Sequence, residues 1–236
     1  MIKVENLTKT YGKVIANDHI SFVVHDGQIA ILIGPNGAGK STTIKSICGL
    51  LRYDGSITID NYHNKSLEAK RQLGYIPEMP AIYDLLTVSE HFDFIARAYK
   101  LENYLDYENE LLRRFELIDK QNKLGKELSK GMQQKLSICC ALLPKPQNLI
   151  FDEPMVGLDP HAIKELKEML KELKKEGRSI LISTHMLDSV EDYWDVAHIL
   201  MNGKTAASKY NNRDIEDEKT LAETFFEITE AKETNS

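Results

Sequence analysis

The 236-residue sequence lacks any apolar run that approaches the roughly 20 residues needed to span a bilayer. Its first residues, MIKVENLTKTYGK, also lack the apolar core of a signal peptide. We therefore expect neither a membrane span nor a secretory leader. Any role at a membrane would then depend on a partner protein.

The sequence also has few cysteines and no excess of positive charge. The three cysteines are Cys48, Cys139 and Cys140, and no CxxC is present. An odd number, with two of them adjacent, favours reduced, buried thiols in a cytosolic protein over a disulfide framework. The chain has 36 acidic residues against 30 Lys and Arg, a net charge of −6, which argues against a nucleic-acid partner.

Apolar residues make up 42% of the chain and charged residues 28%, which is typical of a globular protein. The length suits one large domain or a domain with an inserted subdomain. The charged run at 164–178 mixes both signs. Because Ile163, Leu166, Leu170 and Leu173 recur along one face there, it predicts an amphipathic helix with a solvated side.

The N-terminal part predicts strands. SFVVHDGQIAILI (21–33) carries Asp26 and Gly27 between apolar runs, which indicates a hairpin, and RYDGSITID (52–60) repeats the pattern. Together these segments predict an antiparallel β layer. IAILI (29–33) then leads into glycines and a helical pattern, so it also begins a strand–loop–helix unit.

Helices are predicted from about residue 84 to residue 143. TVSE fits a capping box, with Thr87 as N-cap and Glu90 reaching back to it. ENELLRRFELI predicts a second helix. LSKGMQQK (128–135) opens a third helix, over 131–143, which Pro144 stops. By itself this motif indicates only that Ser129 caps a helix.

Strands and helices alternate in the second half. NLIFDE (148–153) and SILIST (179–184) predict buried strands on either side of a helix over 161–176, hence a parallel sheet. AHILMNGKTAA (197–207) predicts a hairpin, and LAETFFEI (221–228) one or two helical turns in an acidic tail.

The clearest chemical motif is GPNGAGKST, which follows the IAILI strand directly and matches a phosphate-binding loop. Backbone N–H groups of such a loop point at phosphate oxygens, and the following helix adds its positive dipole end. Lys40 would reach the β- and γ-phosphates, and the Ser41 hydroxyl would ligate Mg²⁺. The predicted nucleotide-binding residues of the loop are Gly34, Pro35, Asn36, Gly37, Ala38, Gly39, Lys40, Ser41 and Thr42.

Two acids end the buried strand NLIFDE. A buried carboxylate is costly unless it meets a cation, so Asp152 is expected to join the Mg²⁺ site beside Ser41. Glu153 is expected to orient or deprotonate a water molecule. The alternative is that the two acids only cap the next helix.

Two classes of P-loop enzyme, GTPases and small-molecule kinases, fit the sequence poorly. A GTPase would need N-K-x-D, and the nearest segment, NKLG (122–125), lacks the aspartate. A small-molecule kinase would leave LSKGMQQK and STH (183–185) unexplained.

In order, the motifs resemble those of the ATP-binding subunits of ABC transporters, over about residues 2–207. The matching segments are TYGK with Tyr11, GPNGAGKST, YIPE with Glu78, LSKGMQQK, LIFDEP, GLDP with Asp159, and STH with His185. The resemblance implies an α/β fold, with a P-loop NTPase core on a parallel sheet, an N-terminal antiparallel β subdomain and an inserted α-helical subdomain. It implies a single domain over 1–236, with core 1–83 and 144–210, helical subdomain 84–143 and acidic tail 211–236.

The resemblance also implies the roles of individual residues. Tyr11 would stack on adenine, Glu78 would ligate Mg²⁺ or the attacking water, and His185 would hold the γ-phosphate near Asp159. Ser129 and Gly131 would meet the ATP of a second subunit, so that ATP closes a head-to-tail homodimer. Lys40, Glu153 and His185 would then carry out ATP hydrolysis.

Three residues depart from the family pattern. Lys130 replaces the first glycine of the usual LSGGQ, and Met132 replaces its glutamine. Lys130 either adds a cation near the polyanionic ligand or is simply solvent-exposed. Glu78 stands where a glutamine is usual; its carboxylate can still ligate Mg²⁺ but adds negative charge.

The resemblance implies a cytoplasmic protein held at the inner face of the membrane by a separate permease, most similar to bacterial exporters. We expect Met79, Ile82, Tyr83 and Leu86 to contact that permease; the alternative is ordinary packing beneath the helices. An importer is a less similar possibility. A soluble ABC-type ATPase acting on ribosomes or DNA, or a catalytically silent regulator, are the alternatives of other classes.

Overall fold

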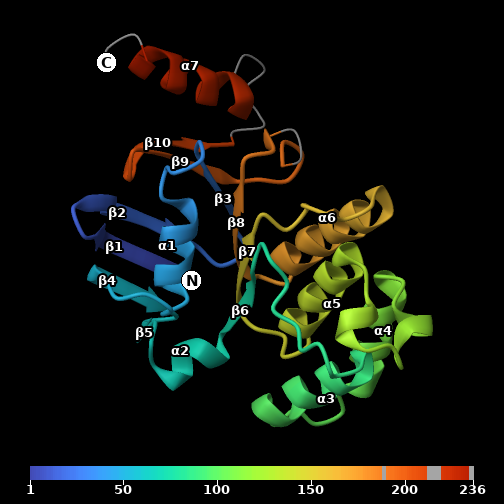
Figure 1. Cartoon of the computed structure of the whole chain (residues 1–236). Helices are drawn as coiled ribbons and strands as arrows, with labels where there is room; N and C mark the ends of the chain where they lie inside the picture. The colour runs from blue at the N-terminus through green and yellow to red at the C-terminus, as the bar shows by residue number, and fades with distance from the viewer. Residues whose placement is uncertain (188–189, 212–218, 234–236) are drawn as a thin grey trace.

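The computed structural model describes residues 1–187, 190–211 and 219–233 (Figure 1). Its N-terminal part forms a four-stranded antiparallel sheet in the order β2-β1-β4-β5, which confirms the predicted antiparallel layer. The strands are β1 (Ile2–Tyr11), β2 (Val14–Val24), β4 (Asp54–Ile59) and β5 (Tyr62–His63).

A six-stranded sheet in the order β10-β9-β3-β8-β7-β6 forms the centre of the molecule. Its strands are β3 (Ile29–Ile33), β6 (Leu73–Ile76), β7 (Asn148–Asp152), β8 (Ser179–Thr184), β9 (Val196–Met201) and β10 (Lys204–Tyr210). β10 is antiparallel to β9, and the other pairs are parallel. The carboxyl ends of β3, β7 and β8 therefore meet at one edge, where the phosphate loop begins and both acids lie.

The predicted hairpin over residues 21–33 is wrong. β2 pairs with β1, whereas β3 pairs with β8 and β9, so the Asp26–Gly27 turn connects two sheets. The physical reason is that all five residues of β3 are buried. A strand with two apolar faces belongs in the middle of a covered parallel sheet, not in a sheet with one solvated face.

The second Asp-Gly pair is not a hairpin turn either. Gly55 lies inside β4, where a Cβ atom would approach the carbonyl oxygen of Asn6 to 2.5 Å. Only glycine allows β4 to lie this close to β1. The turn comes later, at Asp60 and Asn61, which both have positive φ and lead into β5.

The helices begin and end close to the predicted residues. Thr87 and Glu90 form the expected capping box. Ser129 caps its helix by accepting a hydrogen bond from the Met132 N–H at 3.3 Å. The helices are α1 (Lys40–Ile47), α2 (Leu67–Arg71), α3 (Val88–Tyr99), α4 (Leu105–Arg114), α5 (Lys130–Leu142), α6 (Pro160–Lys175) and α7 (Leu221–Glu233), with short 3-10 helices η1 (Ile118–Lys120) and η2 (Gly125–Glu127).

Two apolar clusters build the core. One joins α3, α4, α5 and α6 to the parallel sheet, and the other fills the space between the two sheets around α1. As predicted, α6 is amphipathic: Leu166, Leu170 and Leu173 are buried, and Ile163 is partly buried against the same cluster. The three cysteines are free thiols; Cys139 is buried, and Cys48 and Cys140 are half-buried.

The C-terminal part contains the predicted β9–β10 hairpin, whose turn residues Asn202 and Gly203 have positive φ. α7 follows and extends beyond the predicted turns at 221–228. Within the predicted acidic tail, residues 212–218 and 234–236 lie outside the described residues. Among the helices described, none is both long and apolar enough to cross a membrane. The proposed division into core, helical subdomain and tail stays a prediction.

Candidate functional site

The phosphate loop connects β3 to α1, and Lys40 is the first residue of that helix. The Lys40 ammonium folds back over the loop and donates to the carbonyl oxygens of Gly34 at 2.6 Å and Pro35 at 3.3 Å. Lys40 is only 8% exposed. Burial lowers its pKa, while the charges of Glu153, Asp152 and Glu78 oppose that shift. The loop therefore holds one buried cation facing three carboxylates.

Asn17 of β2 holds this loop in place through hydrogen bonds. It is fully buried, and its Nδ2 donates to the carbonyl oxygen of Gly39 at 3.2 Å and to Thr43 Oγ1 at 3.0 Å. Gly39 has a φ of 102°, and a Cβ atom there would lie 2.5 Å from Asn17 Nδ2. Glycine is thus required at position 39 for both conformation and space. Sequence reasoning missed Asn17, because nothing local marks an asparagine 22 residues before its partner.

Asp152 and Glu153 point into different surroundings although they are neighbours. Asp152 ends β7, is buried, and accepts a hydrogen bond from the Ser183 hydroxyl. Burial raises the pKa of Asp152, and the hydrogen bond from Ser183 counteracts this. Glu153 has a positive φ of 50°, so the chain turns sharply there. Because of this turn, the two neighbouring carboxylates point in different directions.

Glu153 pairs with His185, which follows β8. His185 Nδ1 lies 2.9 Å from Glu153 Oε1, and the His185 backbone N–H donates to Glu153 Oε2 at 3.4 Å. The Glu153 side chain is nearly buried, whereas that of His185 is 57% exposed. One side of the imidazole is therefore held by the carboxylate while the rest of the ring faces solvent.

These groups line one cleft of about 530 Å³. It brings together eleven of the predicted site residues, at the edge where β3, β7 and β8 end. The lining residues are Tyr11, Ala16, Asn36, Gly37, Ala38, Gly39, Lys40, Ser41, Thr42, Glu78, Glu153 and His185. Ala16 was not predicted. Gly34 and Pro35 contact Lys40 rather than the cleft.

Tyr11, the last residue of β1, also lines the cleft. Its ring is half-exposed, and the Lys9 ammonium lies 4.8 Å from its centroid. A half-exposed flat ring that lines the cleft is suited to stacking on a planar base.

Six predicted site residues do not line this cleft: Gly34, Pro35, Ser129, Gly131, Asp152 and Asp159. Ser129 is exposed at the start of α5. A Cβ atom on Gly131 would lie 2.7 Å from the carbonyl oxygen of Gly157, so the start of α5 packs tightly on the loop before α6. Asp159 caps α6, accepting from the Ala162 N–H at 2.9 Å.

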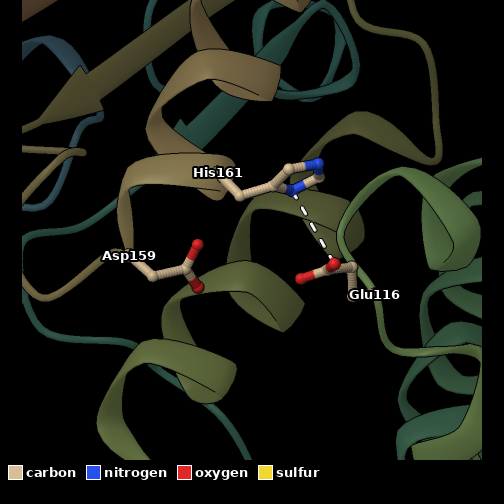
Figure 2. A group of neighbouring side chains, drawn as sticks. All are labelled: Glu116, Asp159 and His161. Atoms are coloured by element: carbon tan, nitrogen blue, oxygen red, sulfur yellow. Dashed lines mark ion pairs between the residues drawn. The ribbon is translucent and has the colours of Figure 1, made fainter.

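Asp159 also belongs to a cluster that could be mistaken for a metal site. Figure 2 shows Glu116, Asp159 and His161, whose ligand atoms lie within 4.8 Å of one another. The ammonium of buried Lys135 lies 2.7 Å from Asp159 and 3.4 Å from Glu116. His161 Nδ1 is 3.8 Å from Glu116. Lys135 already supplies the positive charge, so we assign an ion-pair network here and no metal.

Comparison with known proteins agrees with this geometry. A model of the family described as ABC transporter matches residues 17–156. The chain is 40% identical over 212 residues to the ABC-type transporter ATP-binding protein EcsA of Bacillus subtilis (strain 168), covering 88% of this chain and 86% of that protein. It is 33% identical over 213 residues to the SkfA peptide export ATP-binding protein SkfE of the same organism, covering 89% of each.

Solved structures agree as well. An ATP-binding subunit of an ABC transporter superimposes with a TM-score of 0.91 at 40% identity, covering 97% of this chain and 99% of that one. A bacterial ABC transporter cassette solved as a dimer gives a TM-score of 0.81 at 26% identity, covering 89% and 98%.

The chain belongs to the ABC transporter family, and its fold is the P-loop NTPase fold of that family's cassettes. Within the family, both the relatives and the superimposed structures place it among the ATP-binding subunits.

Proposed function

We propose that this subunit hydrolyses ATP and that hydrolysis drives export through a separate membrane permease. The observation that carries the proposal is the cleft, which collects the phosphate loop, Lys40, Glu153 and His185. Loop N–H groups and the N-terminus of α1 bind the triphosphate, and the Lys40 ammonium exchanges its carbonyl partners for phosphate oxygens. Tyr11 stacks on the base.

Glu153 is the group placed to orient the attacking water and to accept its proton. His185 is held against this carboxylate by the 2.9 Å pair, so its free ring edge is aimed along the same side of the cleft. With both ring nitrogens protonated, it can donate from Nε2 to the γ-phosphate, where negative charge increases during transfer.

The donor set also fits Mg²⁺. Asp152 is a buried carboxylate whose pKa is raised by burial, so a cation beside it would relieve the cost of its charge. Hydroxyl and carboxylate oxygens are the ligands that Mg²⁺ prefers. Ser41, Asp152 and Glu78 would hold the ion, which would neutralise phosphate charge when bound.

The assignment of Glu153 is tested by Glu153→Gln. The amide keeps the shape but cannot take a proton, so we expect ATP binding to persist while phosphate release falls by about 100-fold or more. Steady-state phosphate release and nucleotide titration measure the two effects. Glu168→Gln on the exposed face of α6 is the matched control and should behave as wild type. Undiminished phosphate release from Glu153→Gln would refute the role.

Ser129, Gly131 and Asp159 lie outside the cleft of their own chain. We propose that they complete the cleft of a second copy in a head-to-tail homodimer, with two equivalent sites. The exposed Ser129 at a helix N-terminus is suited to a phosphate, and the exposed Lys130 adds a cation beside it. ATPase activity per molecule should rise with protein concentration. Equal activity from monomer at high dilution would contradict the dimer.

The permease contact is proposed at an apolar groove of about 590 Å³ beside β6 and α3. Of the four predicted contacts, Met79 is 80% exposed and Tyr83 is exposed, whereas Ile82 and Leu86 are half-buried. Leu86 lines an adjoining pocket together with Leu85, which is 73% exposed and was missed by sequence reasoning. Such exposed apolar side chains around a groove favour a protein partner. The groove would hold the subunit at the cytoplasmic face of the membrane.

A charge in this groove tests the contact. Met79→Asp should abolish co-purification with the permease and transport, while ATP binding by the isolated subunit persists. Phe226→Asp, at another exposed apolar residue, on α7, is the control. Unchanged permease binding and transport in Met79→Asp would count against the contact. Export is favoured because similar proteins are named for peptide export and linearmycin resistance.

A further inference from the structure

The turn at residues 190–195 lies between His185 and β9 in the chain, and its second half is fastened to Asn211, which follows β10. The Asn211 N–H donates to the Asp195 carbonyl oxygen at 2.8 Å, and Asn211 Nδ2 donates to the Trp194 carbonyl oxygen at 3.0 Å. The chain that leaves the β9–β10 hairpin therefore returns to this turn and holds its backbone.

The first half of the turn is in contact with α7. Leu221, the first residue of this helix, is fully buried, and its N–H donates to Glu191 Oε1 at 3.4 Å. Phe225 and Ile228 follow on the same face of the helix and are partly buried against the apolar cluster that includes Val190. α7 is therefore docked on the core next to the turn.

The turn keeps its position mainly through packing. Tyr193 and Trp194 are each 2% exposed, yet Tyr193 Oη and Trp194 Nε1 have no hydrogen-bond partner in the part of the chain that the structure describes. Closely packed side chains shift together, and a truncated neighbour leaves a cavity into which they relax. Shortening the Leu221 side chain would therefore loosen the turn.

The turn is connected to His185 through a short piece of backbone. The Val190 N–H donates to the carbonyl oxygen of Leu187, whose side chain is partly buried against the core, at 3.1 Å. His185 contacts Glu153 through its ring at 2.9 Å and through its backbone N–H at 3.4 Å. Because the second of these bonds is long, the position of the His185 backbone depends on the residues that follow it.

We propose that Leu221 and Asn211 are positioning residues for His185. By fixing the turn at 190–195, they hold the imidazole against Glu153 in the arrangement that ATP hydrolysis requires. No described residue of α7 lines the nucleotide cleft, so this helix would serve hydrolysis without contacting ATP. The inference rests on the proposed function, because that function gives His185 its role.

The first test compares kcat and KM for full-length variants at saturating ATP and one protein concentration. Leu221→Ala and Asn211→Ala should each lower kcat by about tenfold, because a small displacement of a reacting group is costly, whereas the affinity for ATP should change less than about twofold. Leu221→Met has nearly the volume of the wild type and should restore kcat. Leu112→Ala, which truncates an equally buried leucine on α4, is the matched control and should keep the wild-type kcat well below its melting temperature.

The second test asks whether these residues act through the imidazole. Each substitution is combined with His185→Ala, and the double variant should have the same kcat as His185→Ala alone, within about twofold, because nothing remains to be positioned. Amide hydrogen exchange in peptides covering residues 184–187 is measured alongside. Exchange there should be about tenfold faster in Leu221→Ala and unchanged in Leu112→Ala.

The outcomes separate this inference from the proposed function. If His185→Ala alone keeps the wild-type kcat, the proposed role of His185 fails, and the inference fails with it. If His185→Ala is slow, the inference is overturned when Leu221→Ala and Asn211→Ala keep the wild-type kcat, or when they lower kcat by the same factor with and without the imidazole. An equal loss in Leu221→Ala and Leu112→Ala also overturns it. Should Leu221→Ala fail to fold, Asn211→Ala decides the question by the same criteria.

Discussion

We predict that the stability of the protein falls in acid because of His198, which lies between the two sheets. This residue of β9 is 4% exposed, and its ring stacks on Phe22 of β2 with centroids 4.8 Å apart. Nδ1 lies 2.9 Å from Ser208 Oγ, and Nε2 has no partner. Burial lowers the pKa of His198 from 6.5 to about 4. A proton here would place a charge in the apolar layer behind the phosphate loop.

The sign and size of the effect follow from the two pKa values. Between pH 6.5 and about pH 4 the unfolded chain binds a proton at this position and the folded chain does not. The free energy of unfolding therefore falls as the pH falls, by about 1.4 kcal/mol per pH unit from this group. The total is on the order of 3 kcal/mol by pH 4, and no such loss occurs above pH 6.5.

The measurement is urea unfolding at several pH values between 7.5 and 4.5, for the wild type and His198→Phe. Phenylalanine keeps the stacking on Phe22 but cannot bind a proton, so its stability should fall less steeply below pH 6.5. Because other groups titrate in both proteins, the difference between the two slopes is the test. His25→Phe, at an exposed turn, should keep the wild-type slope. Identical slopes for wild type and His198→Phe would refute the reasoning.

Two further predictions concern the cleft. Asn17→Ala removes two hydrogen bonds beneath the phosphate loop, at a cost of about 2 kcal/mol. Calorimetry should therefore show a melting temperature lower by roughly 4–8 °C, and titration should show a weaker affinity for ATP. An unchanged melting temperature and affinity would contradict the supporting role of Asn17. Glu78→Gln removes one negative charge beside Lys40, so ATP without Mg²⁺ should bind about threefold more tightly, and the gain should vanish in high salt. Weaker binding by Glu78→Gln at low salt would show that the Glu78 charge does not oppose the nucleotide.

Local patterns in the sequence predicted much of the site. The phosphate loop, the capping box at Thr87, the cap at Ser129 and the acids at the end of β7 each depend on residues a few positions apart. Their chemistry is therefore visible without knowing the fold. The order of the motifs then placed the chain in its family, which the comparisons confirm.

Contacts between distant segments were decided only by the tertiary structure. The Asp26–Gly27 turn was predicted to close a hairpin, yet β3 joins β8 and β9 because burial on both faces outweighs a turn signal. Asn17 beneath the loop and Lys135 between Glu116 and Asp159 could not be predicted, because their partners are up to 26 residues away. Hydrogen-bond and charge partners of this kind depend on how whole elements pack, whereas caps and loops depend on the local backbone.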